Sequence, residues 1–311
     1  MAGRALVTGA SGFIGRALTA ELLRQGWSVV AVGREAAGLP RGAEAIGVAR
    51  YDDTTLSAAL RDIRCDVVFH LAAYGVTPSA RDPGLMFDVN VAGTAAVVRT
   101  AARLGARAVV YAGSSAEYIE APHGTAIAED YPITTSALYG AAKAAGGLWG
   151  RAVAAQEGLV FQWLRVFGVF GPGEAPHRLF PAIAAKLTRD EPVDLSPGDQ
   201  IRDLLYVDDV VLALLLGAMA ALDGKAGPFN LCSGLPVSIR DVALALADAL
   251  GKPHDLLRFG AISYRPDENL WLLGNAARFR EATGFRPRFD IAQAARHFVR
   301  QYESPQAGER T

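Results

Sequence analysis

The sequence has little cysteine and scattered histidine, which narrows the chemistry it can carry. Its 311 residues include two cysteines, Cys65 and Cys232, which are far apart and each lie inside an apolar run. Such cysteines are typical of small core side chains and argue against a disulfide-rich secreted scaffold, so we expect a reducing, cytoplasmic location. Of the five histidines, four have no metal-ligand spacing and His70 falls in a predicted strand. We predict no metal site.

An excess of charge and a long apolar run are also missing. Lys and Arg number 31 against 32 Asp and Glu, a formal net charge of -1, without a block of like charge. This balance argues against nucleic acid or a membrane surface as partner. The apolar segment 207–222 contains Asp208 and Asp209 and is too short to cross a bilayer, so we expect a buried helix. The apolar run that ends at Gly9 is too short for a signal sequence, and we expect no targeting segment.

What the sequence does have is a regular alternation of β-branched runs and amphipathic stretches in its first half. Strands are predicted at residues 5–8, 28–32, 66–70 and 108–112, with helices at 15–25, 54–61 and 89–104 between them. This alternation predicts right-handed βαβ units. The fold class is therefore α/β, with a Rossmann-type, doubly wound parallel sheet.

The second half is less regular. A helix to about Gln156 and a strand at 160–166 precede predicted helices at 177–186, 207–222, 239–250 and 291–302, with short strands at 192–195 and 228–231. We expect a first domain over residues 1–170, to which residues of about 203–232 return. Residues 171–311 would form mainly a smaller α/β lobe interleaved with it.

A glycine-rich loop links the first predicted strand to the first helix. Its sequence is GASGFIG, residues 9–15. Glycines there let the backbone turn sharply and approach a pyrophosphate, which then sits on the positive end of the helix. The loop predicts that the first domain binds a dinucleotide.

The end of the second strand bears on which dinucleotide is bound. NAD-binding folds usually carry an acid there for the ribose 2′-hydroxyl, whereas this strand ends in Gly33 and Arg34. A guanidinium without the acid suits a 2′-phosphate. We therefore prefer NADP over NAD, the alternative being that Arg34 is a solvated loop residue.

A tyrosine and a lysine stand four residues apart at the start of a predicted helix. Tyr139 and Lys143 would share one face at roughly 6 Å, and a nearby cation would lower the pKa of the phenol toward neutrality, making it a usable acid or base. Two hydroxyls, Ser114 and Ser115, follow the strand at 108–112. They lie at the sheet edge where ligands bind, and could hydrogen-bond a carbonyl oxygen.

At this point the chain resembles the extended short-chain dehydrogenase/reductases, and among them the NAD-dependent epimerase/dehydratase group. The likeness spans nearly the whole chain. Its motifs, in order, are the glycine loop, HLAA (70–73), NVAGT (90–94), the Ser-Tyr-Lys set, LR (164–165) with GPG (171–173), and RDLLYVDD (202–209).

The resemblance implies a nucleotide-sugar substrate and roles for individual residues. Tyr139 would be the acid/base, Lys143 would hold the nicotinamide ribose and lower the Tyr139 pKa, and Ser115, with Ser114 as the alternate, would polarise the reacting C–O group. Cofactor contacts are expected from Gly9, Ser11, Gly12, Phe13, Ile14, Gly15, Arg34, Asp52, Leu71, Ala72, Ala73, Asn90, Lys143 and Val166. Substrate contacts are expected from Ser115, Glu117, Tyr139, Arg178, Arg202 and Arg265.

Arg202 is expected on the nucleotide diphosphate, with an ion pair to Asp208 or Asp209 as the alternative. The family also implies a homodimer that pairs helices 89–104 and 139–156.

Departures from the family pattern bear on the reaction. Family dehydratases carry an Asp-Glu pair directly after the catalytic hydroxyl, whereas Ala116 stands where we would place the Asp and only Glu117 remains. Dehydration is therefore disfavoured. The preferred hypothesis is reduction of a nucleotide-activated 4-keto-6-deoxyhexose at C4 by NADPH. The alternatives are an NAD-dependent C4 epimerase of a UDP-sugar and a non-catalytic NADP-binding regulator.

Overall fold

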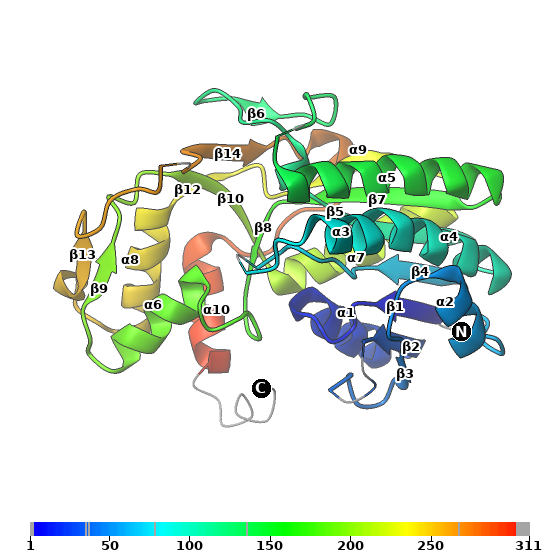
Figure 1. Cartoon of the computed structure of the whole chain (residues 1–311). Coiled ribbons are helices and arrows are strands. Elements are labelled where there is room, and N and C mark those ends of the chain that lie inside the picture. Colours follow the sequence, from blue (N-terminus) through cyan, green and yellow to red (C-terminus); the bar gives the residue numbers. More distant parts are fainter. Residues whose placement is uncertain are drawn as a thin grey trace.

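The chain folds around a seven-stranded parallel sheet, which confirms the predicted fold class. The computed structural model describes residues 3–34, 36, 38–77, 79–134, 136–266 and 268–302. The strand order is β11-β7-β5-β4-β1-β2-β3 (Figure 1). The strands are β1 (Arg4–Thr8), β2 (Ser28–Gly33), β3 (Glu44–Gly47), β4 (Val67–His70), β5 (Ala108–Ser114), β7 (Val160–Val166) and β11 (Pro228–Leu231).

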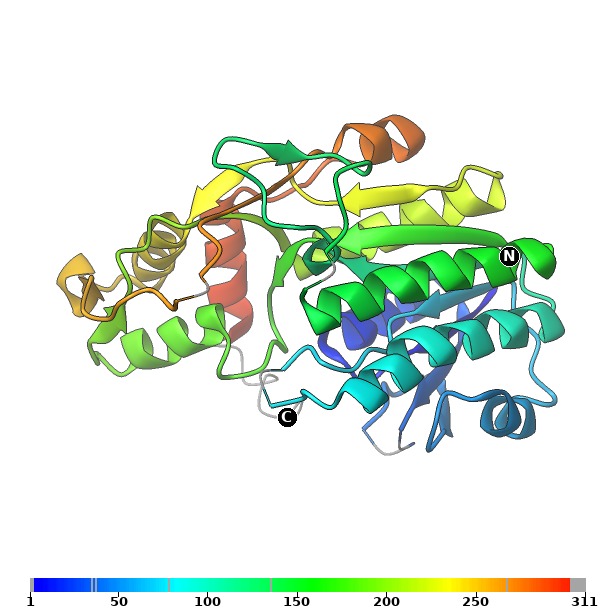
Figure 2. The ribbon, with the colours of Figure 1, turned by 45° about the horizontal axis from the view of Figure 1, so that its top comes forward.

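Helices cover both faces of this sheet. One face carries α1 (Phe13–Arg24) and α7 (Val207–Leu222); the other carries α2 (Asp53–Ala59), α4 (Gly93–Arg103) and α5 (Leu138–Gln156). Figure 2 shows α4 and α5 side by side on their face. β1 lies between β2 and β4, so the order of the strands reverses there: β2 and β3 are added on one side of β1, and β4, β5, β7 and β11 on the other. The crevice beyond the carboxyl ends of these strands is where such sheets bind ligands.

Helix α5 lies unusually close to the sheet because glycines form its inner face. A Cβ atom added at Gly147 would overlap the indole ring of Trp163 on β7, and one at Gly146 would overlap the carbonyl oxygen of Asn90. Two neighbouring elements thus fix how deep α5 sits. Its first turn, which carries Tyr139, is held at the end of β5.

The smaller lobe has its own core, formed by α6 (Leu179–Thr188), α8 (Ile239–Leu250) and α10 (Ile291–Tyr302). A second sheet joins it to the first domain in the order β12-β10-β14-β6, with β8 on β10, and β9 pairs with β13. These strands are β6 (Ala126–Ile127), β8 (Gly168–Phe170), β9 (Val193–Leu195), β10 (Ile201–Tyr206), β12 (Pro236–Ser238), β13 (Leu257–Phe259) and β14 (Trp271–Gly274). The remaining elements are α3 (Pro83–Phe87), α9 (Ala277–Thr283), the π-helix η1 (Asp88–Ala92) and the 3-10 helices η2 (Ser115–Glu117) and η3 (His254–Leu256).

The two parts of the chain are interleaved in space. Strand β6, from the first half, pairs with β14 near the C-terminus. Within the segment 203–232, α7 and β11 lie on the main sheet, whereas β10 belongs to the second sheet. The return to the first domain thus begins at Val207.

Several expected boundaries differ from the structure. The helix expected at 89–104 begins as the π-helix η1 and becomes regular only at Gly93. Strands β3, β6, β8, β10, β12, β13 and β14 were not predicted, and most of these are only two to four residues long. A strand that short is stabilised by its partner strands rather than by its own sequence pattern.

Two further features concern the chain as a whole. Both cysteines are buried free thiols, as expected. Within the described ranges, no helix meets the length and hydrophobicity needed to span a bilayer, and no three His, Cys, Asp or Glu side chains gather as a metal site.

The contact between Gly147 and Trp163 predicts the effect of one methyl group. Gly147→Ala gains about 1 kcal/mol of helix propensity, but the overlap forces the helix outward at a cost of about 1–3 kcal/mol. We expect a lower free energy of unfolding, read as a lower urea midpoint at unchanged slope. A raised midpoint would show that α5 has room to move, contrary to the packing described.

Candidate active site

The glycine loop is shaped to receive a pyrophosphate. Gly9 has a φ of 68°, a conformation that favours glycine, and a Cβ there would lie 2.7 Å from the Ala72 nitrogen. A Cβ at Gly15 would overlap the Gly9 carbonyl oxygen. Gly12 caps α1 without a side-chain hydrogen bond. The first N–H groups of the helix, at Phe13 and Ile14 next to Ser11, are therefore available to bind an anion. The loop therefore fits a dinucleotide.

The loop after β4 closes the other side of this crevice. Leu71 N–H donates to the Thr8 carbonyl at 3.2 Å, and Ala72 N–H donates to Thr8 Oγ1 at 3.4 Å. Ala73 continues this loop, exposed to solvent. His70 is fully buried between Thr8 and Thr94, and burial lowers its pKa to about 3. The imidazole is thus neutral and structural.

Asn90 was expected to contact the cofactor and instead holds this loop. Its Oδ1 accepts from the Tyr74 N–H at 3.0 Å and its Nδ2 donates to the Tyr74 carbonyl at 2.8 Å. The side chain is 0% exposed, so both polar atoms are committed to the backbone.

Asp52 and Arg34, which we expect to contact the cofactor, lie after β3 and β2. Asp52 caps α2 by accepting the Thr55 N–H at 2.8 Å through Oδ1, and its side chain is 46% exposed, so it can still be reached by a ligand. Arg34 lies exposed directly after β2, as its proposed role requires. Tyr51, which the sequence patterns did not highlight, is partly buried, and burial raises the pKa of its phenol, opposed by the Gly9 backbone and the Arg34 charge.

Tyr139 and Ser114 face each other at the carboxyl edge of the sheet. The Ser114 hydroxyl lies close enough to the Tyr139 phenol to lower its pKa against the effect of burial, and Ser114 pairs in register with Val166 on β7. A Cβ at Gly140 would overlap the Ala116 carbonyl oxygen, so the first turn of α5 rests directly on η2. Ser115, our first choice for the polarising hydroxyl, begins η2 one residue later. The geometry favours the alternate, Ser114.

The electrostatics of the pair differ from expectation. Burial raises the pKa of Tyr139 to about 12, opposed by the Ser114 hydrogen bond, rather than Lys143 lowering it. Lys143 is 2% exposed, and its Nζ lies 4.3 Å from the Tyr111 ring centroid. Burial lowers the pKa of this ammonium to about 8, opposed by Glu117. Both groups keep their protons at neutral pH, so Tyr139 is poised as a proton donor.

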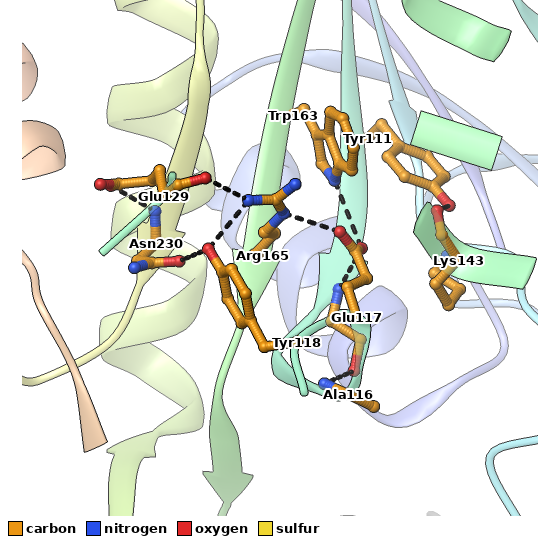
Figure 3. Close-up of polar contacts among 10 residues, drawn as sticks. Tyr111, Ala116, Glu117, Tyr118, Glu129, Lys143, Trp163, Arg165 and Asn230 are labelled. Carbon is orange, nitrogen blue, oxygen red and sulfur yellow. Dashed lines mark hydrogen bonds and ion pairs between the residues drawn. The ribbon is translucent and has the colours of Figure 1, made fainter. Parts of the chain in front are cut away.

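Glu117 was expected to meet substrate and is instead enclosed. Its side chain is 0% exposed, and Oε2 lies 2.7 Å from Nε of Arg165, which is 3% exposed (Figure 3). Desolvation raises the pKa of this carboxyl, opposed by the Arg165 charge. The carboxylate therefore acts within the protein.

The arginines expected at the substrate lie in and beside the smaller lobe. Arg202 pairs with neither Asp208 nor Asp209, but with Glu268 at 2.6 Å, both side chains being about one-fifth exposed. Arg265, exposed, lies in the same turn and accepts the Glu268 N–H at its carbonyl. A phosphate reaching Arg202 would have to compete with Glu268.

Arg178 lies nearer the catalytic pair. It forms the N-cap of α6, is half-exposed, and its charge lowers the Tyr139 pKa against burial. This places a positive charge within electrostatic reach of the phenol.

Glu174 is a residue that sequence patterns missed. Its side chain is 8% exposed, with Oε1 at 3.3 Å from Nε of Arg178. The other oxygen is buried and has no hydrogen-bond partner among the described residues. Burial raises the pKa of the carboxyl to about 7, opposed by Arg178. No motif signals a carboxylate whose environment is assembled by folding.

Glu174 predicts a pH-dependent stability. Because its pKa is raised on folding, the protein gives up stability as pH rises from about 4.5 toward 7. Glu174→Gln should raise the free energy of unfolding at pH 8 by about 1–3 kcal/mol and change it little at pH 4. Thermal melts at both values test this, with exposed Glu191→Gln as the matched control. A gain at pH 8 that also persists at pH 4 would contradict it.

Comparison with known proteins agrees with this geometry. Residues 5–232 match the NAD dependent epimerase/dehydratase family. A UDP-glucose 4-epimerase of Mycolicibacterium smegmatis is 29% identical over 93% of this chain and 95% of its own length. A dTDP-6-deoxy-L-talose 4-dehydrogenase (NAD(P)(+)) of Kitasatospora kifunensis is 30% identical over 94% and 93%. The crystal structure of a Thermus thermophilus UDP-glucose 4-epimerase with NAD has a TM-score of 0.84 at 28% identity, covering 97% of this chain and 99% of that one. The chain therefore belongs to the NAD-dependent epimerase/dehydratase family, extended short-chain dehydrogenase/reductases that modify sugar nucleotides.

Proposed function

We propose that the protein reduces a nucleotide-activated 4-keto-6-deoxyhexose at C4 with NADPH. The observation that carries this proposal is the Tyr139 phenol beside the Ser114 hydroxyl at the carboxyl edge of the sheet, where burial raises the pKa of the phenol. A bound nicotinamide cofactor would supply the hydride to the sugar carbon. A site that must then protonate the new alkoxide needs a group that holds its proton at neutral pH, and Tyr139 meets that need.

The other residues have supporting roles. Ser114 holds the reacting oxygen, and the buried ammonium of Lys143 stabilises negative charge that develops beside it. Arg202 and Arg265 hold the nucleotide diphosphate from the smaller lobe, with Arg178 near the sugar. With Ser114 in the catalytic position, the next two residues are Ser115 and Ala116, and neither supplies the carboxyl that elimination of water requires.

The preference for NADP rests on the end of β2. Gly33 provides no carboxylate and Arg34 is exposed beside the crevice, which suits a 2′-phosphate. The Kitasatospora relative is named for NAD(P)(+), in line with a site that takes the phosphorylated cofactor.

A second candidate is C4 epimerisation of a UDP-sugar with NAD. The same Tyr139 and Ser114 would serve both the oxidation and the return reduction. The relatives from Mycolicibacterium and Thermus are UDP-glucose 4-epimerases, and this favours keeping the alternative.

We also propose that the protein is a homodimer, as its family implied. Leu148 and Trp149 on α5 are 57% and 59% exposed, and Phe87, at the end of the neighbouring α3, is 59% exposed. A second copy would cover these apolar side chains.

The reaction is tested with purified protein, NADPH and a panel of 4-keto nucleotide sugars. We expect stoichiometric loss of nicotinamide absorbance, and about a 10²–10⁴-fold lower kcat in Tyr139→Phe because the proton donor is gone. Inversion of a UDP-sugar without net loss of absorbance would establish the epimerase instead. No turnover of any kind, with ligand binding intact in Tyr139→Phe, would support the non-catalytic regulator.

The cofactor preference is tested at β2. Arg34→Ala should raise the Kd for NADPH about tenfold or more, since a charge-assisted contact is worth about 1.5–3 kcal/mol, and leave the Kd for NADH nearly unchanged. Gly33→Asp should weaken NADPH and strengthen NADH. Arg61→Ala, which removes the same charge beyond the far end of α2, is the control. Equal losses for both cofactors in Arg34→Ala would contradict the proposal.

A further inference from the structure

Directly behind the Ser114 backbone lies the buried carboxylate of Glu117. Its Oε1 accepts the Ser114 N–H at 2.8 Å and the Trp163 Nε1–H at 3.3 Å. The Ser114 hydroxyl in turn accepts the Ala116 N–H at 3.2 Å, closing a capping box around η2. One carboxylate thus sets the conformation of the turn that presents the Ser114 hydroxyl to Tyr139.

Arg165, the counter-ion of Glu117, is also held by several contacts. Arg165 donates from Nε to Glu117 Oε2 at 2.7 Å, and from Nη1 to the Tyr118 hydroxyl at 2.9 Å and the Glu129 carbonyl at 2.8 Å. Its guanidinium carbon lies 4.4 Å from the Trp163 ring centroid and 4.8 Å from that of Tyr118. A buried ion pair is tolerated when its atoms are satisfied in this way. Figure 3 shows the pair between Trp163 and Tyr118.

The network continues into the second sheet. The Tyr118 hydroxyl donates to Asn230 Oδ1 at 2.6 Å, and Asn230 Nδ2 donates to the Ile127 carbonyl at 2.7 Å. The Asn230 N–H donates to Glu129 Oε1 at 2.9 Å. The turn at Ser114 is therefore anchored to β11 and β6, not only to its own strand.

Glu117 also acts at a distance on the catalytic groups. Its charge raises the pKa of Lys143 against the effect of burial, and it adds to burial in raising the pKa of Tyr139 and of Tyr111. The other charged groups facing Glu117 are Arg165 from β7 and Lys143 from α5, and Tyr118 also feels its charge.

We propose that Glu117, held by Arg165, is a positioning residue for catalysis. Through the Ser114 N–H and the capping box around η2, it fixes the Ser114 hydroxyl against Tyr139. From the sequence alone, we expected Glu117 to contact substrate. The proposal rests on the proposed function in taking Tyr139 and Ser114 as the reacting pair, but its electrostatic part is measured without turnover.

The first readout is the titration of Lys143. The chain has four lysines, Lys143, Lys186, Lys225 and Lys252, so selective ¹³C-lysine labelling gives few signals, and Lys143→Met identifies the one of interest. In Glu117→Gln, which keeps an oxygen for the Ser114 N–H but loses the charge, the Lys143 midpoint should move to lower pH than in the parent protein. An unmoved midpoint in the folded variant overturns the proposal.

The matched control is Asp209→Asn. Asp209 is also 0% exposed, accepts Arg288 Nε at 2.8 Å and receives backbone N–H groups of Arg288 and Phe289, but it lies on α7. This substitution should lower stability as Glu117→Gln does and leave the Lys143 titration in place. If both variants shift the Lys143 midpoint equally, the cause is a general loss of stability and the proposal fails.

The second readout is kinetic. With any substrate that turns over, Glu117→Gln should lower kcat about tenfold or more with little change in KM, because positioning acts in the transition state, and should move the pH–rate profile to lower pH. A rise in KM alone would assign Glu117 to substrate binding and overturn positioning. Should Glu117→Gln fail to fold, Glu117→Gln/Arg165→Met removes both charges and takes its place in each measurement. Absence of turnover in the parent protein would count against the proposed function. The Lys143 titration would still decide whether Glu117 acts on the catalytic groups.

Discussion

The ion pair between Glu117 and Arg165 is removed from water at the point where the main sheet meets the second sheet. Charges in such a place are tolerated only if each remaining polar atom finds a partner, since an unpaired buried charge costs several kcal/mol. Arg165 therefore donates hydrogen bonds to the Tyr118 hydroxyl and the Glu129 carbonyl, and Glu117 accepts one from the Ser114 N–H. The end of β5, the turn after it and the segment leading from β6 are fixed by one electrostatic requirement.

A second constraint is the close approach of α5. The glycines on its inner face allow the helix to sit against Trp163 and η2, and this proximity buries Lys143 under Tyr111 and brings Tyr139 to Ser114. Burial moves the two pKa values in opposite directions, up for the phenol and down for the ammonium, because desolvation always disfavours the charged form. The outcome at neutral pH is a phenol and an ammonium that both retain their protons.

Much of the fold follows from patterns that are local. The elements at Val160–Val166, Val207–Leu222, Ile239–Leu250 and Ile291–Tyr302 have the bounds that periodicity predicts, because each buries a face long enough to show its period. The strand pair of β6 and β14 could not be predicted in this way, since two residues carry no period and their partner lies about 150 residues away.

A site residue can be predicted from sequence where its role depends on the backbone conformation, as in the glycine loop. It cannot be predicted where a polar side chain could pair either with a ligand or with another part of the protein. Asn90 and Glu117 both have groups that could bind a ligand, and each is buried and hydrogen-bonded within the protein. Arg202 shows the same ambiguity, because its partner Glu268 lies 66 residues away in sequence. The choice between Ser114 and Ser115 depended on where β5 ends. Ser114 remains paired with Val166 in the sheet and so meets Tyr139, whereas Ser115 already belongs to the next turn.

The surroundings of Glu117 argue against its taking part in a dehydration. A carboxyl that takes part in elimination must reach the sugar and change its protonation state there. Glu117, the nearest acid after the catalytic hydroxyl, is instead neutralised by Arg165 and covered by Trp163, and moving it would leave a guanidinium buried without its partner. The Glu117 carboxylate is thus used within the protein, where it holds the turn that carries Ser114.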